Sequence, residues 1–336
     1  MVDFTFVSQS SRFRRHLLLG TAGLAVLGPA RAQKSEPTPV RLLVGFPAGG
    51  TIDVPARNLA RSASPALGEP IEVRHLAGGG GRVALDALGK GPTDGSLLAL
   101  GTGSMLTLAP NLWKSDWPDP QRDLMPVAMV ASFTFAMNLR PDVPATDLAS
   151  FVAWAREQAA AGRAVHFASH GPGTVSHYCG TLLDRTFGLK LTHLPYRGAP
   201  PARIALESGQ AQLLFDTVGD SLDAHRSHRA RVIATTGADR SAFLPGVPTL
   251  IEQRVAHPSI DGWLAVIAPA GTPAARVARL SAAFRDAAAT PGFIADVDAA
   301  GFVPEPAGPE RVAARIADDL GRWARAIRAL RFEPMA

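Results

Sequence analysis

The stretch from Phe46 to Asp53, read as F-P-A-G-G-T-I-D, has residue types that suit the binding of an anion. It follows a run of Val and Leu, residues 40–44, that predicts a strand buried on both faces. Thr51 can then cap a helix that tolerates Pro55 in its first turn. Glycines let the backbone approach a bound group, and the N–H groups of a first helical turn carry partial positive charge. The stretch predicts an anion site, and a strand-to-helix connection that binds nothing fits these residues equally well.

Two nucleotide-binding motifs are not completed in this chain. Gly78 to Gly81 follow a predicted strand, but Val83 stands where the dinucleotide-binding pattern requires its last glycine. A phosphate-binding loop needs a glycine five residues before Gly89, and that residue is Ala84. We therefore expect no nucleotide and no other cofactor.

Neighbouring serines and histidines do not by themselves form a catalytic pair. Ser169–His170 and Ser176–His177 lie outside any G-x-S-x-G elbow, and adjacent side chains on one element point in different directions. His225 and His228 have a helical spacing, but the arginines beside them favour a solvated helix end over a metal site. We expect no catalytic residue, no metal and no enzyme; an exported hydrolase using Ser176 and His177 stays open as an alternative.

The first 32 residues are typical of an export signal. An arginine pair, Arg14–Arg15, precedes the apolar run 17–27, and Ala30–Ala32 provides small residues for cleavage before Gln33. The apolar run is about half the roughly 20 residues that cross a membrane. The arginine pair resembles a twin-arginine signal, but ordinary signals also carry such pairs. We therefore predict a signal peptide over residues 1–32 and a periplasmic location, with the export route open.

Composition predicts a large, ordinary core and no nucleic-acid partner. The 336 residues exceed the usual size of one domain, and 46% of them are hydrophobic against 19% charged. Four arginines and one aspartate of the leader account for most of the net charge of +5. No block of Lys or Arg is interleaved with aromatic residues. Cys179 is the single cysteine, so it forms no intramolecular disulfide, and its apolar neighbours predict a core position.

Strands and helices alternate along the chain, which predicts a largely parallel sheet with helices on both faces. Ligands of such sheets lie beyond the carboxyl ends of the strands. The apolar run 127–138 is longer than a normal strand, so we split it into two pieces that cross between domains near Ser132. A helix over 147–161 with Thr146 as its cap opens a second alternation. The other expected strands are 71–74, 97–101, 165–168, 191–194, 212–215, 231–235 and 263–268; the other expected helices are 82–88, 174–187, 199–208, 221–226, 274–289 and 309–330.

The chain returns to its first sheet after the second one, which predicts two lobes. We place the first lobe at residues 33–131 and 259–336 and the second at 132–258. After residue 274 we expect only helices.

Seven separated motifs resemble, in the expected order, those of the periplasmic receptors of the tripartite tricarboxylate transporter system, the Bug or TctC family. Each match alone is weak, but together they cover nearly the whole mature chain. Besides Phe46 to Asp53, they are G-P-G-T-V-S-H at Gly171–His177, H-L-P-Y-R-G at His193–Gly198, Gly209–Gln210, L-L-F-D at Leu213–Asp216, L-P-G-V-P-T at Leu244–Thr249 and A-P-A-G-T-P at Ala268–Pro273.

The resemblance implies an α/β, type II periplasmic binding-protein fold: two lobes with mixed, mostly parallel sheets flanked by helices, and a ligand cleft between them. It also implies a monomeric receptor that binds a small carboxylate and passes it to membrane permease subunits of a tripartite tricarboxylate transporter. A helix start from each lobe would face the ligand, with hydroxyls and apolar walls around it. The predicted ligand-binding residues are Phe46, Pro47, Ala48, Gly49, Gly50, Thr51, Asp53, Gly79, Thr102, Ser104, Gly171, Thr174, Ser176, His177, Tyr196, Arg197 and Asp216.

Several of these residues have a structural interpretation of equal or greater weight. Asp216 could accept from a ligand or cap the helix that follows it. Asp53 fits better as an acid that interacts with the dipole of its own helix. Arg197 could reach a second carboxylate or face water, and Trp263 fits the core better than the cleft.

Departures from the family pattern concern the ligand. Thr51 replaces a third glycine and Ile52 replaces a threonine, while His75–Ala77 replace N-R-P and Arg82 replaces an asparagine. These changes favour an apolar or aromatic carboxylate over citrate. A signalling receptor that docks on a sensor kinase stays open as an alternative role.

Overall fold

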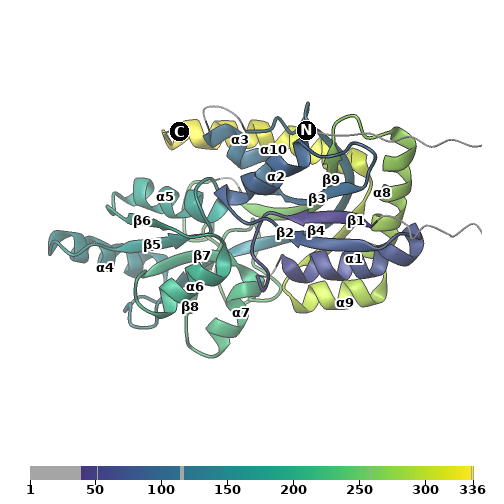
Figure 1. The fold of residues 1–336 in the computed structure, drawn as a ribbon. Helices are drawn as coiled ribbons and strands as arrows, with labels where there is room; N and C mark the ends of the chain where they lie inside the picture. Colours follow the sequence, from purple (N-terminus) through teal and green to yellow (C-terminus); the bar gives the residue numbers. More distant parts are fainter. Residues whose placement is uncertain (1–38, 51, 114–116, 258, 334, 336) are drawn as a thin grey trace, which may run out of the picture. The chain divides into compact units, whose positions relative to one another are not determined.

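The computed structural model describes residues 39–336 except 51, 114–116, 258, 334 and 336, so the predicted signal peptide lies outside the described residues. The sheet is mixed, in the order β2-β1-β3-β9-β4-β7-β5-β6, with β10 and β8 also paired to β4 (Figure 1). The strands are β1 (Val40–Val44), β2 (Ile71–His75), β3 (Leu97–Thr102), β4 (Leu124–Leu139), β5 (His166–Ser169), β6 (Thr192–Pro195), β7 (Leu213–Thr217), β8 (Arg231–Thr235), β9 (Asp261–Pro269) and β10 (Val303–Ala307).

Helices follow most strands, as the alternation predicts. They are α1 (Asp53–Leu67), α2 (Arg82–Gly89), α3 (Ala109–Leu112), α4 (Leu148–Ala160), α5 (Val175–Phe187), α6 (Ala199–Glu207), α7 (Val218–Arg226), α8 (Ala274–Ala288), α9 (Pro291–Ala299) and α10 (Pro309–Ala329), with a 3₁₀ turn at Gly79–Gly81 and a π-helical turn at Ser104–Leu108. Among the residues with described placement, no helix is long and apolar enough to span a membrane.

Long strand β4 joins two parts of the sheet. Its residues up to Thr134 pair with β9, and those from Phe135 onward pair with β7 and β8. We call β1, β2, β3, β9, β10 and the start of β4 the first lobe, and β5 to β8 with the end of β4 the second lobe. The apolar run is therefore one continuous strand and not two pieces, because both sheet parts supply it with hydrogen-bond partners. The change of pairing partner lies between Thr134 and Phe135.

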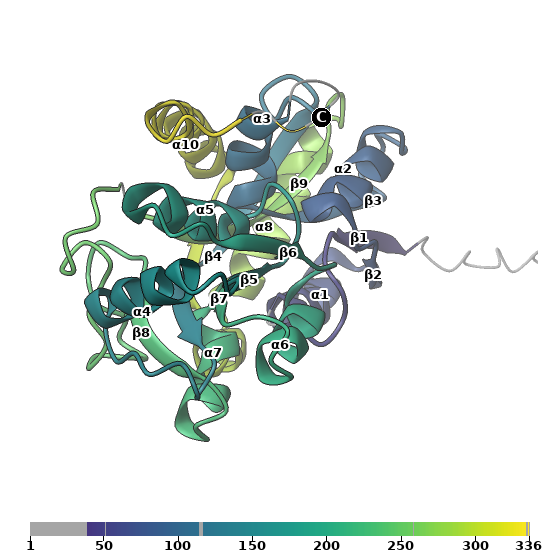
Figure 2. The ribbon, with the colours of Figure 1, turned by 90° about the vertical axis from the view of Figure 1, so that its left-hand side faces the viewer.

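Alternation along the strands explains why helices cover both faces of the first lobe. Leu42 and Val44 of β1 face the core built with α1, α8 and α9, while Leu43 between them faces the core built with α2 and α10. Figure 1 shows α2, α3 and α10 on one side of these strands and α1 and α9 on the other, and Figure 2 again shows α2 and α10 on the opposite side from α1. Trp263 is fully buried, as predicted, and its Nε1 donates to Asp319 of α10 over 2.9 Å.

Two further local predictions are wrong. Helix α4 is capped by Asp147, whose carboxylate accepts from the Ser150 amide, because Asp147 and not Thr146 completes a capping box with Ser150. The segment after α8 is not wholly helical, since β10 pairs with β4. Its sequence, V-P-E-P-A, carries two prolines and gives little strand signal. The residue boundaries proposed for the lobes stay predictions.

Candidate functional site

Helix α1 begins one residue later than predicted. Ile52 occupies the N-cap position and makes no side-chain capping hydrogen bond, while Thr51 lies outside the described residues. The Asp53 carboxylate fixes the loop in another way, since it accepts from the Gly49 amide over 3.1 Å. Gly49 has a φ of 78°, a conformation that favours glycine.

The Asp53 carboxylate interacts with neighbouring groups of the protein itself. Its Oδ1 lies 2.8 Å from Arg57 Nε and 2.9 Å from His75 Nε2. Burial alone would raise the pKa of this carboxyl, but the hydrogen bonds from Arg57 and Gly49 and the charge of His75 hold the pKa below its usual value. This placement agrees with the structural interpretation of Asp53.

Helix α5 begins at Val175, one residue after the predicted start, and Thr174 is its N-cap. The Thr174 hydroxyl accepts from the His177 amide at 3.4 Å and donates to the Gly171 carbonyl at 2.7 Å. Gly171 and Gly173 both have positive φ, at 128° and 77°, so the turn depends on glycine at these two positions. The amides of the first turn of α5 have no acceptor within the helix and lie at the N-terminal end of this helix of the second lobe.

One cavity joins these two helix starts. It contains about 530 Å³ of space free of protein atoms, open solvent at its mouth included. The N-terminal residues of four helices border it: Ile52 of α1, Thr174 of α5, Ala199 of α6 and Thr217 of α7. Its complete lining is Phe46, Pro47, Gly50, Ile52, Thr102, Ser104, Phe133, Phe135, His170, Thr174, Val175, Ala199, Pro200, Thr217 and Asp220. Several helix N-termini that converge on one cavity favour an anionic ligand.

The two lobes touch beside this cavity at glycines. A Cβ on Gly80 would lie 2.6 Å from the Pro172 carbonyl oxygen, and a Cβ on Gly198 would lie 2.5 Å from Pro47 Cδ. Real Cβ atoms do not approach other atoms so closely, so each contact requires a residue without a side chain. The glycines near the site therefore serve the approach of one lobe to the other.

Apart from Thr51, which lies outside the described residues, the predicted site residues divide into three groups. Phe46, Pro47, Gly50, Thr102, Ser104 and Thr174 line the cavity. Gly79, Gly171, Tyr196 and Arg197 line an adjacent cavity that shares Phe46 and His170 with the first. Gly49 lines a groove that shares Pro200 and Asp220 with the first cavity. Ala48, Asp53, Ser176, His177 and Asp216 are not among the residues that line the main cavity.

Ser176 and His177 support the second lobe from within. Ser176 is fully buried, and its hydroxyl donates to the Phe215 carbonyl over 2.5 Å. The His177 ring stacks on His193, with 4.0 Å between the ring centroids. Burial lowers the pKa of His177 to about 4, and burial together with the charge of His177 lowers the pKa of His193 to about 3. Both rings are therefore neutral at pH 7.

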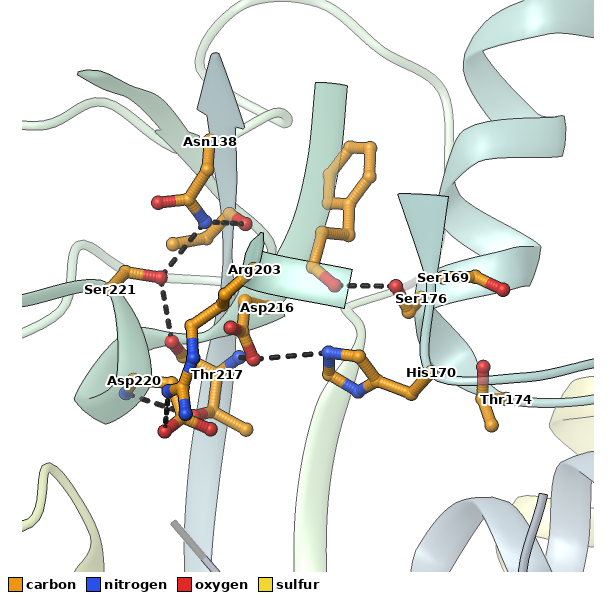
Figure 3. A network of polar contacts seen from close by, with 12 residues as sticks. Asn138, Ser169, His170, Thr174, Ser176, Arg203, Asp216, Thr217, Asp220 and Ser221 are labelled. Carbon is orange, nitrogen blue, oxygen red and sulfur yellow. Dashed lines mark hydrogen bonds and ion pairs between the residues drawn. The ribbon is translucent and has the colours of Figure 1, made fainter. Parts of the chain in front are cut away.

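Asp216 stands behind the cavity wall. It is 1% exposed, its Oδ1 accepts from the Thr217 amide, and the same atom lies 3.1 Å from His170 Nε2 (Figure 3). The cap of α7 is Thr217, whose hydroxyl accepts from the Asp220 amide. Asp216 thus does not cap this helix, because its carboxylate is turned to the Thr217 amide and His170. Figure 3 also shows Arg203, which pairs with Asp220, close to Asp216.

Sequence reasoning missed part of the cavity lining. Phe133 and Phe135 alternate with the half-buried Ser132 and Thr134 along β4, and this period of two is the signal that could have placed them on one face. His170 was considered only as a neighbour of Ser169. The remaining missed residues are Ile52, Val175, Ala199, Pro200, Thr217 and Asp220.

The cavity offers hydroxyls, apolar side chains and helix N-termini to a bound solute. Among the described residues, no group of three or more His, Cys, Asp or Glu side chains could hold a metal ion. Cys179 is fully buried, and burial raises the pKa of its thiol, as expected for an inert core cysteine. Two lobes joined through β4, with hydroxyls, apolar side chains and helix N-termini around one cavity, define a solute-binding protein of the two-lobed kind.

Comparison with known proteins identifies the family. Residues 55–332 match the family model of the tripartite tricarboxylate transporter family receptor, TctC, and the chain belongs to that family. It is 30% identical over 313 residues to protein BugT of Bordetella pertussis strain Tohama I. The aligned residues cover 93% of this chain and 94% of BugT. The family consists of substrate-binding receptors, and the predicted Bug/TctC membership is confirmed.

Solved structures confirm the fold. The periplasmic binding protein BugD is similar with a TM-score of 0.82 and 28% identity, covering 88% of this chain and 98% of BugD. MatC from Rhodopseudomonas palustris with bound malate has a TM-score of 0.81 and 27% identity, covering 87% of this chain and 99% of MatC. The predicted type II periplasmic binding-protein fold, with mixed sheets flanked by helices, is therefore confirmed. The expectation that the sheets are mostly parallel is wrong, because five of the nine strand pairs among the described residues are antiparallel, and all five involve β4 or β9.

Proposed function

We propose that this receptor captures a small carboxylate in the cavity between its lobes and delivers it to the permease subunits of a tripartite tricarboxylate-type transporter. The observation that carries the proposal is the convergence of four helix N-termini on one cavity. Helix α6 contributes only the Ala199 amide in its first turn, because Pro200 and Pro201 have no N–H. Malate bound to MatC supports a carboxylate as the kind of ligand. We further propose that residues 1–32 direct the chain to the periplasm and that it acts there as a monomer.

Backbone amides can hold such a ligand without a lysine or arginine. First-turn amides are fixed by the helix before the ligand arrives, so no side-chain entropy is lost when they bind it. Hydroxyls of Thr102, Ser104 and Thr174 add donors, and bridging water can satisfy the remaining carboxylate lone pairs. Binding then lowers the free energy of the closed arrangement and couples the ligand to lobe movement.

We propose no catalytic activity for this chain. The Ser176 hydroxyl donates to the Phe215 carbonyl and is fully buried, so it does not meet a substrate in the cavity. His177 stacks on His193 and does not contact Ser176 through any described hydrogen bond. These contacts argue against the exported-hydrolase alternative. Docking on a sensor kinase would use the same binding step and differs only in the partner that receives the closed receptor.

The test is a thermal-shift screen of the purified full chain, freed of bound solutes by dialysis. Carboxylates and the corresponding neutral amides are compared at equal concentration. A ligand at a hundredfold its dissociation constant stabilises by about 2.7 kcal/mol, which gives a measurable rise in Tm. We expect some carboxylates to raise the Tm while their amides do not. Equal shifts with acid and amide, or no shift with any acid, would contradict the proposal.

A further inference from the structure

The inner surface of the cavity is largely apolar. Phe133 and Phe135 stand two residues apart on β4, with 5.3 Å between their ring centroids, and Phe46 and Ile52 join them from the loop before α1. The Phe133 ring packs closely on Gly262 of the paired strand, where an added Cβ would lie 2.3 Å from the ring. These side chains offer van der Waals contact to a hydrocarbon body and no hydrogen-bond donor to an anion.

Charged groups occur on one side of the cavity, in the second lobe. Of the described residues that line the cavity, only His170 and Asp220 can carry charge. Asp220 forms an ion pair with Arg203, which lies outside the lining. Asp216 lies behind His170, and its Oδ2 is buried without a hydrogen-bond partner among the described residues.

This distribution allows one bound negative charge and opposes a second. The Asp220 and Asp216 carboxylates face Arg203 and His170, so even with His170 protonated these four groups carry no net positive charge. One ligand carboxylate can use His170, Thr174 and the amides of α5. Within this cavity, a second carboxylate would meet either the phenyl rings or the side that carries the two aspartates, and an unpaired buried charge is strongly disfavoured. Arg197 lines the adjacent cavity and is not part of this lining.

Resting on the proposed function, we propose that the ligand is a monocarboxylate with an apolar or aromatic body, and that the cavity discriminates against dicarboxylates. The carboxylate faces the second lobe, and the body packs on Phe133, Phe135 and Ile52. MatC, in contrast, is described with malate, a dicarboxylate, although its fold is closely similar. The difference between the two receptors then lies in the lining and not in the architecture.

Hexanoate and adipate give a matched test, because both contain six carbon atoms in a chain and differ in the second carboxylate. Their dissociation constants for the purified, dialysed full chain are measured by isothermal titration calorimetry at pH 7. We expect hexanoate to bind at least tenfold more tightly than adipate. Equal or tighter binding of adipate would overturn the inference while leaving the proposed function intact. Absence of binding by any carboxylate of the screen would overturn both.

A variant tests the part that the apolar body plays. Ile52→Ser changes a half-buried side chain at the cavity and leaves the strands untouched. We expect it to weaken hexanoate binding several-fold and adipate binding less, so that the ratio of the two dissociation constants falls. An unchanged ratio would contradict contact between Ile52 and the body of the ligand. Hexanamide, which lacks the charge, should bind neither protein.

Discussion

The two sides of the cavity are built from similar parts but differ in charge. Each lobe contributes a glycine-containing turn and a helix start, and each contributes hydroxyl side chains. The first lobe adds Phe46 and Ile52 and no titratable residue among those described in the lining, while the second adds His170 and Asp220. We infer that either lobe can bind a neutral part of the ligand, but that the second lobe binds the negatively charged carboxylate.

The starts of α1 and α5 also differ in how they are capped and in the charge beside them. Thr174 caps α5 with its hydroxyl and lines the cavity, whereas α1 has no side-chain cap at Ile52. Asp53 instead ties the first loop to Arg57 and His75. Its negative charge offsets part of the positive potential at the start of α1. The difference teaches that a shared strand-glycine-helix pattern does not guarantee equal anion sites.

Disturbing the approach of the lobes should have the largest effect. In Gly80→Ala, the new Cβ meets the Pro172 carbonyl at 2.6 Å, so closure around the ligand requires a backbone shift. We expect carboxylate affinity to fall about tenfold to a hundredfold, because strain of this kind is worth about 1–3 kcal/mol. Gly188→Ala is the matched control, since its φ is also 64° but no atom lies within 4 Å of the added Cβ. Equal losses of affinity in the two variants, measured by calorimetry, would contradict a closure contact.

Acid should weaken the second lobe before the first. The pKa of His177 is lowered to about 4, so between pH 6.5 and pH 4 the unfolded chain binds more protons than the folded chain. The free energy of unfolding should therefore decrease as the pH falls through this window, by about 1–2 kcal/mol from this group. Urea unfolding at pH 7 and pH 5 measures the loss. His177→Gln, which does not titrate, should lose less between these pH values; an identical loss would exclude His177 as the cause.

Removing the cap of α5 should separate stability from binding. Thr174→Ala removes the hydroxyl that accepts from the His177 amide, and loss of such a cap costs about 1 kcal/mol. Thr290→Ala removes the equivalent cap of α9, where the hydroxyl accepts from the Phe293 amide outside the cavity lining. We expect similar decreases in unfolding free energy for both and a loss of carboxylate affinity only for Thr174→Ala. A parallel loss of affinity in Thr290→Ala would show that the effect is one of stability.

The smallest effect is expected at Asp53. Asp53→Asn removes the ion pairs with the exposed Arg57 and with His75 but can keep an acceptor for the Gly49 amide. We expect a decrease in unfolding free energy of about 0.5–1 kcal/mol at pH 7 and little change in ligand selectivity. Denaturant unfolding and the ratio of hexanoate to adipate affinity provide the two measurements. A large change in that ratio would place charge recognition in the first lobe as well.

Local patterns in the sequence predicted most of the architecture because each strand or helix carries its own signal. The run 40–44, the glycines after it and the cap Thr174 are all readable without tertiary information. β10 was missed because its strand state depends on pairing with β4 and not on its own residues. Tertiary pairing also makes β4 continuous where length alone suggested two strands.

The site was harder to predict than the fold. Motifs identified Phe46, Gly50 and Thr174 at the cavity, since they belong to the turns themselves. Phe135 and His170 come to the cavity only through the way in which the two lobes meet, and no local pattern encodes that meeting. Side chains such as Ser176, which were expected to face a ligand, proved to bind the neighbouring strand instead.

The central claim is that a carboxylate occupies the space between the two helix starts. A crystal structure of the full chain with the tightest-binding carboxylate of the screen tests it most directly. We predict the ligand between Thr174 and Phe133, with its carboxylate toward the amides of α5 and His170. A ligand bound outside this cavity, or one whose carboxylate points to Phe133 and Phe135, would contradict the account.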